Sequence, residues 1–221
     1  MFKSKRRPIV IPQSEHARLS GIITSLWGND DFDKPSFDFQ SFVLGVILHD
    51  RGYDPLDNKA IGETSGEAWL QTQRDGIMRS CENPIANITT LLHIRRLLSA
   101  LDSPIIKEHI NLANQQIDLS LAKTEHSLAD FEWADRITDS CDSTSFAFSF
   151  EEPQQVKRLV SPRVGSDETI EVEFSVDGMG LIRAEPWTLS VDRYEGFIMG
   201  YELDGYPERL EPVYVPFSIV R

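Results

Sequence analysis

The segment that most constrains the fold is residues 41–53 (SFVLGVILHDRGY), an apolar run that ends in an adjacent His49-Asp50 pair. Its apolar residues leave no polar face, so we expect protein to surround the segment on all sides. The pair then lies at the edge of a hydrophobic core. An imidazole beside a carboxylate can chelate a divalent cation, and the negative end of a helix that terminates here would favour a positive ion. The alternative is a buried polar cap at a helix end.

Composition narrows the class of protein and of ligand. The 221 residues are 40% hydrophobic and 26% charged, which is typical of a globular chain with one substantial core. A net charge of -13 argues against a nucleic-acid partner, because such surfaces neutralise phosphates. An anionic small-molecule substrate or ligand would need help from a metal ion or an arginine cluster. The two cysteines match no zinc spacing, so we expect free thiols and a cytoplasmic location.

The chain starts with a basic segment, MFKSKRRPIVIP, that contains only three consecutive apolar residues, Ile9, Val10 and Ile11. This run is too short for a secretory signal and far too short to span a membrane. We therefore expect a solvated tail and no membrane partner. The residues indicate no particular oligomeric state.

Helical spacing predicts a series of helices that carry the histidines. One opens at Ser14 and places His16 on its apolar side. A lone histidine there is more often a core residue than a ligand. Another helix carries His93 at the border of its apolar face, and Arg95 and Arg96 follow directly, so that either guanidinium could bind an anionic ligand. The predicted helices after the apolar run cover residues 68–78, 85–101, 103–121 and 128–145.

The last predicted helix carries three aspartates within eight residues. Asp135 and Asp142 lie on one stripe about 10 Å apart along the axis, so they cannot both coordinate one ion. Asp139 is offset from Asp135 by roughly 40° and is a third option. The alternative is a group of solvated acids on an exposed face.

From Glu151 the pattern changes to alternating apolar and polar residues separated by Gly or Pro. This pattern predicts a small antiparallel sheet. Because such a short segment can scarcely form a stable unit alone, we expect the sheet to pack on the helices. The prediction is a mainly α chain with a helical domain at residues 1–150 and a small β subdomain at residues 151–221 packed on it.

The order His16, His49-Asp50, His93 and a late aspartate resembles the HD-domain superfamily of metal-dependent phosphohydrolases. The segments PQSEHARLSG, HDRGY, LLHIRRLL and CDSTSF also resemble an uncharacterised bacterial family of unknown function. That family carries Q-x-x-H-A-x-L-x-G, H-D-x-G-aromatic, L-H-x-x-x-L and D-x-x-S, and the likeness covers essentially the whole chain. Together the resemblances imply an HD-domain-like helical bundle with a small C-terminal antiparallel sheet.

Carried over residue by residue, the resemblance implies His16, His49, Asp50 and Asp142 as ligands of a divalent metal ion (Mn, Fe, Mg, Zn or Ni). Asp142 is preferred because CDSTSF directly precedes the β portion, although the ADRIT segment around Asp135 also resembles the terminal motif. The pattern has two departures, Tyr53 in place of tryptophan and Phe146 in place of an aliphatic residue, which alter the wall of the pocket.

The implied function is a metal-dependent phosphohydrolase that acts on a small phosphate ester or nucleotide. Asp50 would orient the attacking water and His93 would line the cleft, so both are candidate catalytic residues. Arg95 or Arg96 would bind the phosphate. The alternative is a non-catalytic ligand-binding or scaffold domain in which the cluster is a structural hydrogen-bond network. No general acid for the leaving group is apparent, which keeps this alternative open.

Overall fold

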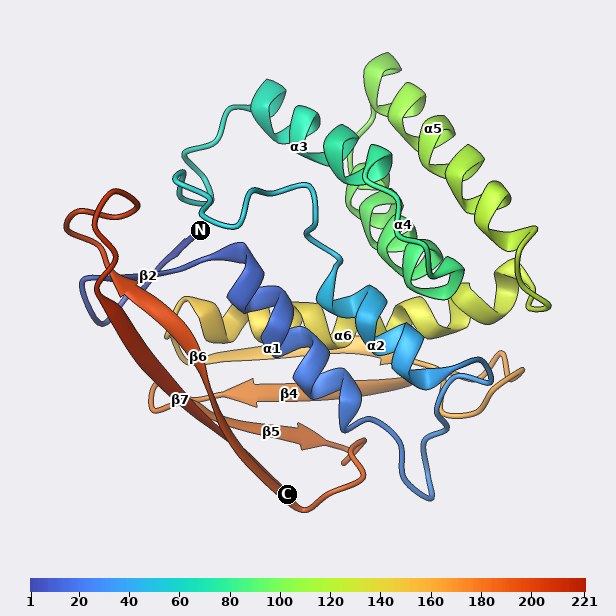
Figure 1. The fold of residues 1–221 in the computed structure, drawn as a ribbon. Coiled ribbons are helices and arrows are strands. Elements are labelled where there is room, and N and C mark those ends of the chain that lie inside the picture. Colours follow the sequence, from blue (N-terminus) through green and yellow to red (C-terminus); the bar gives the residue numbers. More distant parts are fainter.

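The computed structural model describes residues 1–221 and has an α/β fold, with one mixed sheet of seven strands and the helices gathered on one side of it (Figure 1). The helices are α1 (Gln13–Ser25), α2 (Phe39–Ile47), α3 (Gly66–Met78), α4 (Pro84–Ser99), α5 (Pro104–Leu121) and α6 (Leu128–Ser149). The strands are β1 (Phe2–Lys3), β2 (Ile9–Ile11), β3 (Gln154–Val160), β4 (Ile170–Val176), β5 (Leu181–Glu185), β6 (Arg193–Glu202) and β7 (Pro212–Val220). Their order across the sheet is β1-β2-β6-β7-β5-β4-β3, and the pairing of β5 with β7 is parallel.

The prediction of a mainly α chain, an HD-domain-like helical bundle with a small sheet, is wrong. The structure is 41% helix and 20% strand, and the sheet curves into a half-barrel. Part of the difference lies in β1 and β2, which belong to the segment interpreted as a solvated tail. Strand β1 pairs with β2, β2 pairs with β6 through Ile9↔Glu202 and Val10↔Tyr201, and Phe2 and Ile11 are fully buried. Strands of two and three residues are too short to give an alternating pattern.

The helices form two layers over the sheet. Helix α6 packs on β3 and β4, α1 packs on β6, and the two helices contact each other. Helices α2 and α4 cover them, and α3 and α5 lie outermost against α4 (Figure 1). One cluster of 38 buried residues runs through helices and sheet alike. The division of the chain at residue 150 stays a prediction, and strands from both sides of it share the sheet.

Side-chain caps fix where most helices begin, close to the starts that the sequence predicts. Helix α2 begins after Asp38, whose carboxylate accepts a hydrogen bond from the Ser41 N–H at 2.8 Å. Helix α6 begins with a reciprocal capping box between Ser127 and Asp130. The expectation that protein surrounds the apolar run on all sides is wrong for one face, where Leu44 is 38% exposed. No helix combines the length and apolar character needed to cross a membrane.

Candidate metal centre

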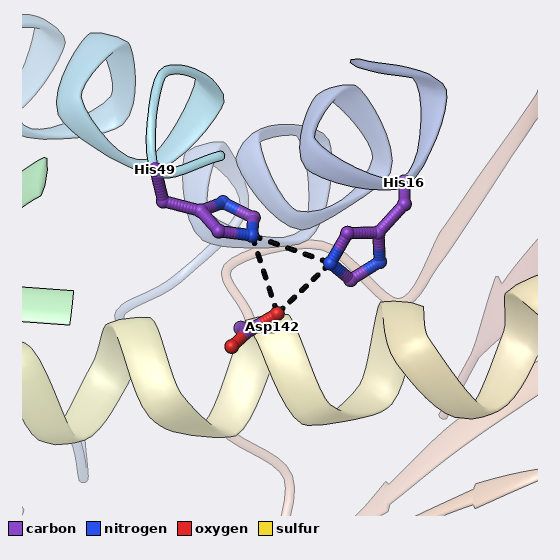
Figure 2. A group of neighbouring side chains, drawn as sticks. All are labelled: His16, His49 and Asp142. Carbon is purple, nitrogen blue, oxygen red and sulfur yellow. Dashed lines mark hydrogen bonds and ion pairs between the residues drawn. The ribbon is translucent and has the colours of Figure 1, made fainter. Parts of the chain in front are cut away.

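Five polar side chains from four separate parts of the chain meet at the inner layer of helices. We call them the His/Asp cluster: His16, His49, Asp50, His93 and Asp142. His16 comes from α1, His93 from α4 and Asp142 from α6, and the His49-Asp50 pair follows the end of α2. Figure 2 shows the imidazoles of His16 and His49 pointing toward the carboxylate of Asp142. The three histidines are each at most 2% exposed.

The packing of α1 on α6 holds His16 over Asp142. The Ser145 hydroxyl, one turn after Asp142, donates a hydrogen bond to the backbone carbonyl of His16 at 2.7 Å. The ring of Phe2 from β1 packs against the His16 imidazole with 4.9 Å between ring centroids. The N-terminal strands therefore help to position a residue of the cluster, which the sequence pattern does not indicate.

The close crossing of α2 and α4 brings His49 beside His93. A Cβ atom at Gly45 would lie 2.5 Å from the Cβ of Thr89 and 2.8 Å from a backbone oxygen of α4, so the crossing requires glycine. The hydroxyl of Thr90 donates to the Gly45 carbonyl at 3.0 Å across the same contact. As a result, the His49 and His93 rings lie 4.5 Å apart between centroids.

The candidate ligand atoms surround one point. The Nε2 atoms of His16 and His49 lie 3.2 Å apart. Oδ1 of Asp142 is 2.9 Å from His16 Nε2 and 3.3 Å from His49 Nε2. Oδ2 of Asp50 is 3.7 Å from His16 Nε2 and 3.3 Å from His49 Nε2. Nε2 of His16, Nε2 of His49 and Oδ1 of Asp142 lie close enough to share one ion at bonds of about 2 Å, and Oδ2 of Asp50 lies beside the same two nitrogens.

A second hydrogen bond sets the tautomer of His49. Its Nδ1 lies 2.6 Å from the backbone carbonyl of Val46, at the end of α2. A carbonyl only accepts, so Nδ1 carries the proton and, in the neutral ring, Nε2 presents its lone pair to the cluster. Metal-binding histidines in proteins are commonly oriented by such a bond. His49 is therefore arranged as a ligand through Nε2.

Arg96 sets the opposite arrangement at His93. Its guanidinium NH2 lies 3.1 Å from Nδ1 of His93, and because a guanidinium only donates, Nδ1 accepts. The proton of the neutral ring is then on Nε2, which lies 3.8 Å from Oδ1 of Asp50 and has no hydrogen-bond partner. His93 thus presents a hydrogen-bond donor to the site rather than a lone pair.

The electrostatics of the cluster favour one positive charge at its centre. Burial opposes charge on His49, but the carboxylates of Asp50 and Asp142 outweigh it and hold the pKa of His49 well above its usual value. Burial likewise opposes ionisation of the two aspartates, but His49 and the other histidines lower the pKa of both, that of Asp142 most. Burial and the neighbouring His49 lower the pKa of His93 to about 3, so this ring stays neutral.

The two arginines and the three aspartates that the sequence also suggested lie at different distances from the cluster. Arg95 points away from the cluster and pairs with Glu132 at 2.7 Å. Arg96 contacts the cluster, but it also forms ion pairs with Asp135 and Asp139, so it is already neutralised. Of the three candidate late aspartates, Asp142 is the one that lies in the cluster.

A cavity of about 480 Å³ opens onto the cluster. Besides cluster residues its wall contains Gln13, Tyr53, Trp69, Leu97, Leu101 and Phe146. Sequence reasoning missed Gln13 and Trp69 as site residues. A signal for Gln13 exists, because it lies three residues before His16 and hence on the same face of α1. Trp69 has no such signal, since α3 reaches the cavity only through the tertiary fold.

The chemistry of the donors suits a divalent transition metal. Two imidazole nitrogens and two carboxylate oxygens are a ligand set typical of Zn, Fe, Mn or Ni, whereas Mg prefers oxygen ligands alone. Two groupings in the cluster have ligand atoms within 4.8 Å of one another: His16, His49 and Asp142, and His49, Asp50 and His93. The tautomer of His93 favours the first grouping.

Comparison with known proteins gives a family but no function. The family described as "Protein of unknown function (DUF3891)" matches residues 2–204. No curated protein and no solved structure matches the chain.

Proposed function

The chain belongs to the DUF3891 family of proteins of unknown function, and we propose that it binds a divalent metal ion in the His/Asp cluster and uses it to hydrolyse a phosphate ester. His16, His49, Asp50 and Asp142 are the ligands in this proposal. His93 lines the cavity beside them, and Arg96 orients His93.

The observation that carries the proposal is the meeting of two imidazole Nε2 atoms 3.2 Å apart between two carboxylates. The Val46 carbonyl holds the proton of His49 on Nδ1, so its Nε2 is a ready ligand. Nε2 of His16 lies 2.9 Å from Oδ1 of Asp142, a carboxylate oxygen that only accepts, so this contact is favourable when a proton or a cation lies between the two atoms. A metal ion satisfies all four ligand atoms at once.

The residues around the ligands have distinct roles in the proposed hydrolysis. When bound, the ion polarises a phosphoryl oxygen and lowers the pKa of a coordinated water toward neutrality. Asp50 lines the cavity, and its Oδ1 lies 3.8 Å from His93 Nε2, so in this proposal Oδ1 accepts a hydrogen bond from the attacking water. His93 donates from Nε2 to an oxygen of the ester. Arg96 keeps His93 in that tautomer.

The choice of phosphate esters rests on the order of the ligands along the chain. That order, a histidine, an adjacent His-Asp pair and a late aspartate, resembles the HD-domain phosphohydrolases. Because this chain has an α/β fold, the resemblance to those enzymes lies in the motifs and not in the fold. Among hydrolytic substrates, a phosphate ester is also the one whose negative charge most needs a metal in a chain of net charge -13.

Elemental analysis of protein purified without added metal tests the metal site. We expect about one equivalent of Mn, Fe, Zn or Ni in the wild type and its loss in Asp50→Ala. Asp54→Ala is the matched control, because Asp54 is an exposed aspartate of the following loop. Release of inorganic phosphate from a panel of monoesters, diesters and nucleotides by the metal-loaded protein then tests hydrolysis.

The competing function is a non-catalytic ligand-binding or scaffold domain. It is favoured by the same two carboxylates, since a proton on His49 would also supply the positive charge that they attract. A metal-free wild type that folds like the variants and releases no phosphate would favour this function and would sink the proposed one.

A further inference from the structure

The cavity beside the His/Asp cluster contains two buried polar atoms without partners. Oε1 of Gln13, a residue that is 4% exposed, accepts no hydrogen bond. Nε2 of His93, a residue that is 2% exposed, donates none. Both residues line the cavity. Leaving such atoms unpaired is costly in a folded protein, so an unpaired acceptor and an unpaired donor on two residues that line one cavity point to a ligand that pairs with both.

Aromatic and aliphatic side chains form the walls around these two atoms. Phe146 lies one turn after Asp142 on α6, and Leu97 lies one turn after His93 on α4, so both flank the cluster directly. Trp69 from α3 and Tyr53 from the loop after His49-Asp50 close the other sides. Burial raises the pKa of the Tyr53 hydroxyl, so this side chain stays neutral. Such walls suit a flat apolar group.

The charges of the cavity limit the rest of the ligand. Lys59 is the one lysine in its wall, no arginine lines it, and Lys59 forms no ion pair. The N-terminal amine of Met1, also in the wall, pairs with Asp57, and burial lowers its pKa to about 5. One free ammonium group and a metal ion match a single phosphate rather than a chain of phosphates. Asp50 and Asp142 are the only carboxylic acids that line the cavity. With both assigned to the metal, no strong acid is left to protonate a leaving group.

From these observations we propose that the substrate is a phosphate monoester of an aromatic alcohol whose ring carries an N–H or O–H donor. The ring occupies the space between Trp69 and Phe146, its donor pairs with Oε1 of Gln13, and His93 Nε2 donates to an ester oxygen. The proposal rests on the proposed function for its reaction and on the cavity for its specificity.

The reaction is a hydrolysis that needs no further co-reactant. Water attacks phosphorus, the bond from phosphorus to the aromatic oxygen breaks, and the products are inorganic phosphate and the free aromatic alcohol. One proton of the water stays on the phosphate and the other ends on the alcohol. An aryl oxide is a weaker base than an alkoxide and departs without strong-acid help, which fits a cavity that offers only the weak acids Tyr53 and Lys59.

Binding of the alcohol alone tests the cavity without any hydrolysis. The purified protein is titrated with 3- and 4-aminophenol, phenol and cyclohexanol, and tryptophan fluorescence is recorded, with Trp69→Phe to identify the signal of the cavity. We expect an aminophenol to bind tightest and cyclohexanol weakest. Gln13→Leu should weaken aminophenol binding about tenfold and leave phenol unchanged, since one hydrogen bond is lost. The control Gln71→Leu, at an exposed glutamine of α3, should change neither.

Equal binding of phenol and cyclohexanol would overturn the aromatic assignment, and a Gln13→Leu variant that binds aminophenol like the wild type would overturn the assignment of a donor on the ring. Phosphate release from aminophenyl phosphates and from glycerol phosphate tests the substrate class separately from the proposed function. Preferential release from the aryl ester supports the substrate class. Equal release from both esters overturns the substrate class alone, and no release from either overturns the proposed function and the substrate class together.

Discussion

Two neighbouring polar clusters along α6 both contain aspartates, and they differ in the side chains that face those aspartates. In the first, Asp142 faces three histidines at 2.9 to 3.4 Å. In the second, which we call the Arg/Asp cluster, the members are Arg96, Asp135, Asp139 and Arg158. Here Arg96 pairs with both aspartates, and Arg158 lies 3.0 Å from Asp139.

The difference lies in the permanence of the positive charge. Guanidinium groups stay charged at all ordinary pH values, so two arginines balance two aspartates in the Arg/Asp cluster. Imidazoles can be neutral, and a neutral imidazole offers a lone pair to a metal. The His/Asp cluster therefore has two carboxylates and room for a cation. One helix thus carries a complete ion-pair network and, one or two turns away, the proposed ion-binding site.

The largest contrast should appear in metal affinity. Asp142→Asn keeps the shape of the side chain but removes the charge that faces His16 and His49, so we expect metal affinity to fall about 100-fold or more. Asp139→Asn should leave it within about twofold, because Asp139 faces arginines. Competition titration against a metal-chelating dye measures both. Equal losses in the two variants would erase the distinction between the clusters.

The second largest effect should be the change in thermal stability when the metal is removed from the His/Asp cluster. A chelator should lower the thermal midpoint of the wild type by about 5–10 °C, if the metal is present at about 100 times its dissociation constant. The Asp142→Asn variant should show no such shift, since it holds no metal. Differential scanning calorimetry with and without chelator measures the midpoints. A chelator effect of the same size in the variant would locate the stabilising ion elsewhere.

The Arg/Asp cluster should respond in stability rather than in metal content. Arg96→Met leaves Asp135 and Asp139 without their shared cation, and we expect a loss of about 2 kcal/mol in the free energy of unfolding. Arg95→Met is the control, because its more exposed pair with Glu132 should be worth about 0.5 kcal/mol. Urea unfolding in chelator measures both variants. Similar values for the two would mean that the network contributes little.

The smallest effect should come from a third carboxylate, Glu151, just after α6. Burial opposes its ionisation, but hydrogen bonds from Arg7 and Ser4 lower the pKa of Glu151 below its usual value. Glu151→Gln should cost about 0.5 kcal/mol near neutral pH. Because the folded pKa is lowered, this difference should be complete above about pH 4.5 and disappear as the pH falls through the folded pKa. Urea unfolding between pH 3 and 7 measures it.

The helices could be predicted from sequence because they follow local rules, whereas the meeting of the cluster residues was predicted from the family resemblance. A period of 3.6 residues places His16 and Asp142 on inward faces, and the resemblance selected Asp142 among three aspartates. The same rules fail for Arg95 and Arg96. Adjacent helical residues point about 100° apart, and only the packing of α4 on α6 decides which guanidinium meets the aspartates.

The sheet was underestimated because its pairing is not local. Residues Ile9 and Val10 carry no sign that their partners are Glu202 and Tyr201. Two- and three-residue strands are stable only when a long partner such as β6 supplies the hydrogen bonds. The fold class depends on those pairs, so a mainly α chain was predicted where an α/β chain exists.

One residue, Pro12, separates the end of β2 from the start of α1. The helix that carries His16 is therefore tied to a strand whose partner, β6, is translated about 190 residues later. On the ribosome, the elements that carry His49, His93 and Asp142 can all emerge while His16 still lacks its support. Uptake of an ion at the proposed metal site would then follow completion of the sheet.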